Sequence, residues 1–168
     1  MGPPVNPLDS PIFSPIFRAV LSFARKLQGG VVVRKVLTVG VFDYFHLGHL
    51  RLFKKARQLG DYLIVAVQDD DSIAKTKPDF ETFYTTQERI ELVEAVRVVD
   101  EVIIYKDVDT LVPQIDFDIF AVGEDQNHEG FQRAIEWCKE HGKTVVRIRR
   151  TGGGICSSRI KKNIMALR

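Results

Sequence analysis

The apolar residues of this chain gather in short runs from about residue 31 onward, and longer segments with apolar positions three and four residues apart separate them. Short β-branched runs are typical of strands buried in a sheet, whereas spacings of three and four indicate amphipathic helices. The runs predict strands over residues 36–41, 63–67, 102–105, 118–122 and 144–148. The periodic segments predict helices over residues 47–59, 85–98, 109–114, 129–141 and 157–165.

The alternation of strand and helix predicts the fold class. Strands that alternate with helices form a parallel sheet, and right-handed crossovers place the helices on both of its faces. We therefore expect a single α/β domain over residues 31–168, a Rossmann-like doubly wound fold with a five-stranded parallel sheet. In such folds ligands bind beyond the carboxyl ends of the strands, where the strand order reverses. Chemistry-bearing residues that follow a predicted strand are therefore the first candidates for a site.

Residues 1–30 have a different character and are predicted to be an N-terminal extension. The prolines of the first fifteen residues argue against regular structure there. Phe17, Val20, Leu21 and Ala24 then recur at helical spacing. We expect a short amphipathic helix that packs on the domain or on a second subunit. A basic helix at a membrane surface and an appended leader sequence are the alternatives.

Composition narrows the function classes. The chain has 168 residues and a formal net charge of +2, too small a charge to indicate a nucleic-acid partner. No run approaches the length of a membrane span, and the start lacks the charged and apolar regions of a secretory signal. Cys138 and Cys156 show no metal-ligand spacing and are interpreted as reduced thiols. We expect a cytoplasmic protein without stable membrane association.

The strongest chemical signal directly follows the first predicted strand, in the segment Gly-Val-Phe-Asp-Tyr-Phe-His-Leu-Gly-His that begins at Gly40. A helix is predicted to begin here, and its free backbone N–H groups and dipole favour an anion. His46 and His49 are three residues apart and can lie on one side of the first turn. Gly48 between them leaves room for a phosphate. Two imidazoles aimed at one phosphate suit phosphoryl or nucleotidyl transfer.

This segment resembles the His-x-Gly-His motif of the cytidylyltransferase-like nucleotidyltransferase superfamily. Together with Gln-Leu-Gly-Asp-Tyr-Leu over residues 58–63, it is most similar to the glycerol-3-phosphate cytidylyltransferase group and its choline- and ethanolamine-phosphate relatives. The resemblance extends over residues 36–164. It implies that the loop after the first strand binds the nucleotide through Gly40, Val41, Phe42, Asp43 and Gly48. For Asp43 two roles are open: it holds the loop, or it assists a phosphate-bound Mg²⁺.

The resemblance also assigns residues outside this loop. Lys75 corresponds to a phosphate-binding lysine that Lys77 assists. Arg89 corresponds to the arginine that opens the next helix and is assigned to nucleotide binding, with an ion pair on the helix surface as the alternative. Gly123 and Asp125 match a stretch near the base. The segment 149–160 matches a second anion site, but it has one extra glycine within 152–154, and Cys156 replaces a hydroxyl residue. Its implied contacts to the nucleotide are Arg150, Ile155, Ser157 and Ser158.

The implied reaction is transfer of CMP from CTP to a phosphorylated small molecule, with glycerol 3-phosphate as the first expectation, and release of pyrophosphate. His46 and His49 would stabilise the α-phosphate, and Lys75 would hold that phosphate or the acceptor's. Arg150 and Ser157 would hold the leaving pyrophosphate, with Mg²⁺ bound mainly by the phosphates. Relatives suggest a homodimer. An adenylyltransferase acting on a phosphorylated sugar or cofactor precursor, and a non-catalytic nucleotide-binding module, are the alternatives.

Overall fold

A computed structural model describes residues 33–76, 81–150 and 156–166 of the chain. The chain divides into two units, residues 1–32 and 33–168, and everything described belongs to the second unit. The expected N-terminal helix, Lys77, Ile155 and the glycines of 152–154 lie outside the described residues.

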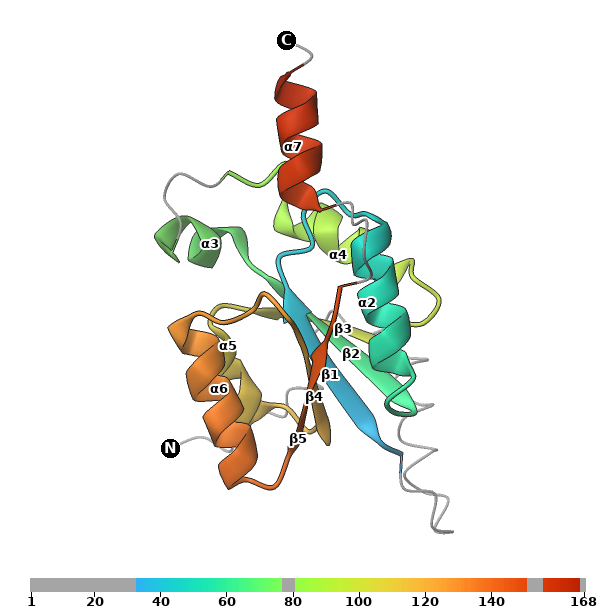
Figure 1. Ribbon diagram of the computed structural model, residues 1–168, viewed down its shortest axis with the longest axis vertical. Helices are drawn as coiled ribbons and strands as arrows, with labels where there is room; N and C mark the ends of the chain where they lie inside the picture. The colour runs from blue at the N-terminus through green and yellow to red at the C-terminus, as the bar shows by residue number, and fades with distance from the viewer. Residues whose placement is uncertain (1–32, 77–80, 151–155, 167–168) are drawn as a thin grey trace, which may run out of the picture. The chain divides into compact units, whose positions relative to one another are not determined.

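The described part of the second unit is built on a five-stranded sheet with the order β3-β2-β1-β4-β5, and every neighbouring pair is parallel (Figure 1). The order reverses between β1 and β4, which makes the fold doubly wound, as the sequence predicted. The pairing of these two strands is brief: Val36 opposes Ile119 and Leu37 opposes Phe120. The strands are β1 Lys35–Gly40, β2 Tyr62–Gln68, β3 Glu101–Tyr105, β4 Ile119–Gly123 and β5 Thr144–Ile148.

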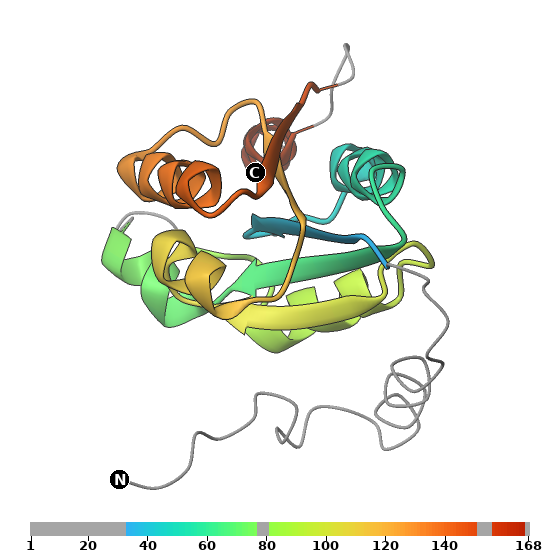
Figure 2. The ribbon, with the colours of Figure 1, turned by 90° about the horizontal axis from the view of Figure 1, so that it is seen from below.

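Helices cover both faces of this sheet because successive strand residues alternate between the faces. In β1, Val36 packs with Phe53 and Ala56 of helix α2 (Leu47–Arg57) and with α4 (Thr86–Glu94). Leu37 and Val39 point the other way, toward α5 (Val108–Leu111), the 3₁₀ turn η2 (Val112–Gln114) and α6 (Glu129–Glu140). Figure 2 shows α2 and α6 on opposite sides of the sheet. The core is therefore two apolar clusters separated by the sheet.

Local sequence signals predicted some of the helix ends correctly. Thr85 and Glu88 form the predicted capping box, and α7 spans Ser157–Met165 as expected. Helix α4 ends at Glu94, although apolar periodicity predicted it to continue to residue 98. The valines that follow pack against the core through tight turns, which end the helix.

Helix α3 (Asp70–Thr76) was not predicted, because it is short and polar. Its start has a recognisable cap, since the Asp69 carboxylate accepts a hydrogen bond of 2.6 Å from the Ser72 amide. The helix expected over 109–114 is α5 followed by the turn η2, which contains Pro113. Within the described ranges, no helix has both the length and the apolar character needed to cross a bilayer.

Candidate active site

The loop between β1 and α2 has an unusual backbone. Phe42 and Tyr44 have φ angles of 57° and 47°, in the left-handed region that residues with a Cβ rarely adopt. Gly40 makes this path possible, because a Cβ there would lie 2.8 Å from Cζ of Phe42. The Phe42 ring is buried and packs edge-on against Phe53 of α2, with centroids 5.0 Å apart. Non-glycine residues in this conformation cluster at functional sites, where the surrounding structure fixes them.

Asp43 is one of the groups that fix this loop. Its carboxylate accepts backbone hydrogen bonds from Phe83 at 3.0 Å and Tyr84 at 3.1 Å, and the residue is only 2% exposed. Its carbonyl accepts a 3.0 Å hydrogen bond from the Ser157 hydroxyl at the start of α7. Asp43 therefore ties together the loop, the segment before α4 and the N-terminus of α7. Of its two expected roles, holding the loop fits this geometry.

The same geometry does not fit Asp43 as a metal ligand, because both carboxylate oxygens are already engaged with amides in a buried setting. In the part of the chain that the structure describes, no group of three or more His, Cys, Asp or Glu side chains is arranged to hold a metal ion.

Arg89 is the second residue that fixes the loop, and it does not face a ligand. The residue is 0% exposed. Its guanidinium donates to the carbonyls of Val41 and Gln68 at 2.7 and 2.8 Å, which joins the ends of β1 and β2. The guanidinium also donates hydrogen bonds to the Tyr84 carbonyl, the Asp70 carboxylate and the Thr86 hydroxyl. An arginine has five N–H donors, and here protein groups take them all, which leaves none for the nucleotide contact that the sequence suggested.

His46 and His49 lie together at the start of α2, as their spacing predicted. Their rings are stacked with centroids 3.9 Å apart and an angle of 21° between the planes. His46 is the N-cap residue, and its Nδ1 accepts a 2.9 Å hydrogen bond from the Gly48 amide. A neutral imidazole that accepts at Nδ1 carries its proton on Nε2. The cap therefore orients His46 with an N–H group available to an incoming oxygen.

Both histidines are held in the neutral form. Burial lowers the pKa of His46, and the positive charge of Arg150 lowers it further. Burial lowers the pKa of His49 to about 3, and His46 and Arg150 add to the effect. Neutral imidazoles act on a phosphate as hydrogen-bond donors rather than as cations.

Arg150 comes from the opposite wall of the site, just beyond β5. Its guanidinium forms an ion pair of 2.5 Å with Asp125, and its backbone amide donates to Glu124 at 3.0 Å. The sequence assigned Arg150 to the triphosphate and Asp125 to the base or ribose. In this structure the two are partners, and both side chains are more than half exposed.

Gln126 and Arg147 are site residues that sequence reasoning missed. The Gln126 amide accepts from the Gly123 N–H and donates to the Val39 carbonyl, each at 2.8 Å, so it bridges β4 and β1 where they diverge. Arg147 donates to the carbonyls of Gly123 and Gln126 at 3.2 and 2.9 Å. The only available signal was their position, next to the Gly-Glu-Asp run and within the last strand.

The remaining predicted residues are distributed around this centre. Lys75 is exposed in the last turn of α3 and makes no hydrogen bond to a described residue. Ser157 begins α7 and contacts the loop through Asp43. Ser158 lies in α7, and its side chain is not among those described. The structure thus joins the histidines and Ser157 to the loop, pairs Arg150 with Asp125, and places Lys75 on a separate helix.

Comparisons with known proteins identify the family of this chain. The family described as cytidylyltransferase-like matches residues 37–164. The glycerol-3-phosphate cytidylyltransferase of Bacillus subtilis is 34% identical over 139 residues, which cover 80% of this chain and all of the relative. An FAD synthase of Thermococcus kodakarensis is 38% identical over 120 residues, covering 68% of this chain and 78% of the relative.

A solved structure shows the same fold. The lipopolysaccharide core biosynthesis protein from Thermoplasma volcanium superposes with a TM-score of 0.59 at 28% identity, covering 71% of this chain and 98% of that one. The doubly wound sheet of this chain agrees with the family match over residues 37–164. The chain belongs to the cytidylyltransferase-like family of nucleotidyltransferases.

Proposed function

We propose that this protein transfers CMP from CTP to a small phosphorylated alcohol, with glycerol 3-phosphate as the first candidate. The observation that supports this most is the stacked, neutral histidine pair at the start of α2. It lies in a domain that aligns with the full length of a glycerol-3-phosphate cytidylyltransferase. A phosphate acceptor suits a site of hydrogen-bond donors, since its oxygen is already a nucleophile and needs no general base.

The chemical step is an in-line displacement. A phosphate oxygen of the acceptor forms a bond to the α-phosphorus of CTP, and the bond from that phosphorus to the bridging oxygen breaks. The electron pair leaves with pyrophosphate, and no proton has to move. Catalysis of such a step consists of positioning the reactants and stabilising charge on the phosphate oxygens.

The described residues can supply this stabilisation from two sides. Nε2–H of His46 and the ring of His49 would face the oxygens of the α-phosphate, and the first amides of α2 would add their dipoles. Arg150 would exchange Asp125 for the leaving pyrophosphate, because its present partner is exposed and easily displaced. Ser157 places the N-terminus of α7 against the same loop.

The test is a pyrophosphate-release screen of CTP, ATP, GTP and UTP against glycerol 3-phosphate, phosphoethanolamine, phosphocholine and sugar phosphates. The proposal expects turnover with CTP and one of the phosphoalcohols. A preference for ATP of about tenfold or more, equal to about 1.4 kcal/mol in transition-state binding, would reject it. Binding of CTP with no turnover on any acceptor would support a nucleotide-binding module instead.

A second candidate function is adenylyl transfer to a phosphorylated cofactor precursor. The observation in its favour is the 38% identity to the FAD synthase of Thermococcus kodakarensis. FAD contains AMP joined to a flavin phosphate, so the same displacement chemistry would serve. Flavin mononucleotide with ATP therefore belongs in the screen, and flavin fluorescence reports this reaction directly.

A further inference from the structure

Helix α7 projects from the domain. Figure 1 shows it extending away from the sheet, with its last residues farthest from the core. Its first turn is held in place, because the Ser157 hydroxyl donates a 3.0 Å hydrogen bond to the Asp43 carbonyl in the loop between β1 and α2. Farther along the helix, Lys162, Asn163 and Ile164 are all exposed, and the exposed fraction of Ile164 is 45%. The outer half of α7 is therefore exposed to solvent in the single chain.

A helix of this length needs a packing partner. Helix α7 has nine residues, whereas isolated helices shorter than about 12–15 residues are only marginally stable in water. Short helices in proteins are held mainly by the packing of an apolar face. Ile160 and Ile164 are four residues apart and form such a face. The exposure of Ile164 therefore indicates that another surface covers this face in solution.

The charge of α7 restricts which surface can cover it. The helix carries Arg159, Lys161 and Lys162 and no acidic residue. All three cations lie within one turn of Ile160. A complementary surface should therefore combine apolar side chains with carboxylates.

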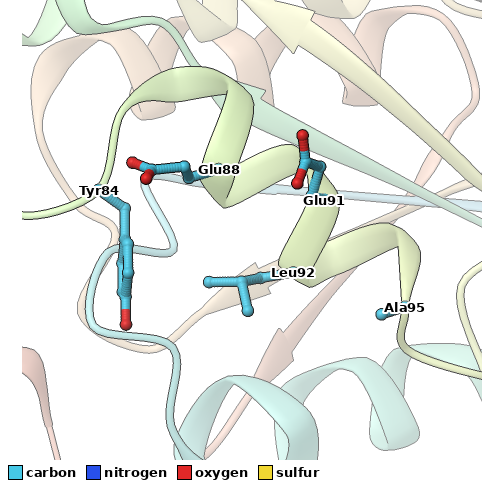
Figure 3. A pocket seen from close by; sticks show the side chains of 5 residues that line it. All are labelled: Tyr84, Glu88, Glu91, Leu92 and Ala95. Carbon is cyan, nitrogen blue, oxygen red and sulfur yellow. The ribbon is translucent and has the colours of Figure 1, made fainter.

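A surface of this kind lies beside α4. It is a hollow of about 290 Å³ lined by Tyr84, Glu88, Glu91, Leu92 and Ala95 (Figure 3). Figure 3 shows the Leu92 side chain directed toward the Tyr84 ring, with the two carboxylates on one side of them. The hollow, which we call the α4 hollow, is therefore apolar along its length and acidic along one side.

Helix α4 does not neutralise this acidic side. It carries Glu88, Glu91 and Glu94, which are all exposed. Its one cation, Arg89, is 0% exposed and donates to carbonyls inside the domain. Hydrogen bonds from Thr85 lower the pKa of Glu88, so this carboxylate stays ionised. Helix α4 thus carries three exposed carboxylates, and α7 carries three cations.

The α4 hollow and α7 begin at the same place in the fold. The Asp43 carboxylate accepts from the amides of Phe83 and Tyr84 just before α4, and its carbonyl accepts from Ser157 at the start of α7. All five residues that line the hollow belong to α4 or lie next to its ends, so α7 does not fill it in its own chain. Two copies related by a twofold axis can exchange the helix, because each copy supplies both a helix and a hollow.

We propose that α7 of each protomer lies in the α4 hollow of a second copy of this chain, which gives a homodimer with two reciprocal contacts. Ile164 then covers Leu92 and Ala95, and the cations of α7 face the carboxylates beside them. The inference concerns assembly and does not depend on which nucleotide or acceptor the protein uses. It also links assembly to the site, because docking of α7 holds Ser157 against the loop before the histidines.

Charge reversal tests this interface in the full chain. Sedimentation velocity should show a wild-type dimer that weakens as the salt concentration rises, because the contact is partly electrostatic. Lys162→Glu and Glu91→Lys should each raise the dimer Kd by about tenfold or more, since each places like charges together in both contacts. Glu88 is left unchanged because it caps α4. An equimolar mixture of the two variants should form a heterodimer, because both of its contacts again join opposite charges.

Two further variants complete the test. Glu136→Lys is the matched control, because it makes the same charge change on α6, which packs on the other face of the sheet. Its dimer Kd should equal that of the wild type. Ile164→Ser removes the apolar contact without a change in charge. It should weaken the dimer and leave the thermal unfolding of the diluted, monomeric protein unchanged.

Several outcomes would overturn the proposal. A wild-type protein that is monomeric at every concentration would do so. A dimer whose Kd is the same in Lys162→Glu and Glu91→Lys as in the wild type would show that another surface joins the copies, and failure of the mixed variants to form a heterodimer would show the same. Vesicles of equal parts phosphatidylglycerol and phosphatidylcholine test the other occupant. Binding of a monomeric wild type that is lost in Lys162→Glu and kept in Glu91→Lys would assign α7 to a membrane surface instead.

Discussion

Arg150 and Asp125 are joined by an ion pair of 2.5 Å, although each was expected to contact a different part of the nucleotide. The side chains are 57% and 55% exposed, so water screens the pair and its contribution to stability is small. Such a pair holds the arginine without binding it tightly. A triphosphate, which offers more negative charge, can replace the carboxylate at little cost.

This arrangement predicts opposite effects for the two partners. Arg150→Ala should weaken binding of pyrophosphate and raise the KM for CTP by about tenfold or more, because a charge-assisted contact is lost. Asp125→Asn should leave pyrophosphate binding unchanged or strengthen it by up to about fivefold, since an exposed pair contributes at most about 1 kcal/mol. Calorimetry with pyrophosphate measures both. A similar loss in the two variants would mean that Asp125 positions Arg150 for the ligand rather than competing with it.

The histidine pair should affect turnover much more than nucleotide binding. His46→Ala and His49→Ala should each lower kcat by about a hundredfold or more, as expected for donors that act on the transition state. The Kd for CTP should change little, because many contacts share ground-state binding. Steady-state kinetics measures kcat, and calorimetry measures the Kd for CTP.

His46 needs an additional control, because it also caps α2 through the Gly48 amide. His46→Asn keeps a good N-cap residue and removes the Nε2–H donor. If His46→Asn is as slow as His46→Ala but more stable toward unfolding, the catalytic loss belongs to the donor. Near-normal turnover in His46→Asn would assign the effect to the cap.

The neutral state of His49 predicts how stability depends on pH. The folded protein keeps its pKa at about 3, against 6.5 for an ordinary histidine. The unfolded chain therefore binds this proton at a higher pH than the folded one does. Stability should be complete above about pH 6.5 and should fall, by an amount on the order of a few kcal/mol, as the pH drops toward 3. Urea unfolding at pH 8, 6, 5 and 4 measures the fall.

The comparison variant is His49→Gln, which cannot titrate in this range. The difference from wild type at pH 8 gives the packing cost of the substitution alone. This difference in the free energy of unfolding should shrink or reverse between pH 6 and 4, because the unfolded wild-type chain then binds a proton at His49 that the folded chain does not bind. Parallel curves for the two proteins would show that His49 is protonated normally in the fold. His46 acts in the same direction, so a smaller slope remains in the variant.

The fold could be predicted well from the sequence because the patterns that specify its strands and helix ends are local. The β-branched runs gave the strands, and the spacing of Thr85 and Glu88 gave the start of α4. The histidine pair was also local, since both residues lie in one helical turn. The role of Arg89 could not be predicted from neighbouring residues. Its guanidinium donates to the carbonyls of Val41 and Gln68, which are 48 and 21 residues away in the sequence. A motif shows that an arginine is present, but not which acceptors the folded chain brings to it.

Arg89 should accordingly be a stability residue with an indirect effect on activity. Arg89→Ala leaves the carbonyls of Val41, Gln68 and Tyr84 without this donor, and each buried acceptor that loses its hydrogen bond costs about 1–3 kcal/mol. The Asp70 carboxylate keeps its bonds from Thr82 and Thr86. Arg89→Lys should recover only part, because an ammonium cannot reach the same set of acceptors. Urea unfolding measures the free energy of unfolding of the wild type, Arg89→Lys and Arg89→Ala, which should decrease in that order. Full stability with a raised KM for CTP would instead mean that Arg89 turns toward the ligand.

Gly40→Ala tests whether the left-handed path of the loop is needed for catalysis. The new Cβ would lie 2.8 Å from Cζ of Phe42, so the buried ring must move, and overpacking of this kind costs about 1–3 kcal/mol. Because Phe42 also contacts the His49 ring, at a centroid distance of 5.3 Å, its shift should disturb the histidine pair and lower kcat.

Gly142→Ala is the matched control. Gly142 has a φ of 68° with open space around it, so alanine strains the backbone after α6 without touching the site. We expect both variants to lose stability and only Gly40→Ala to lose turnover in the folded protein, measured well below its unfolding temperature. Equal kcat values in the two variants would show that the site tolerates movement of Phe42, and the strained loop would then serve the fold rather than the reaction.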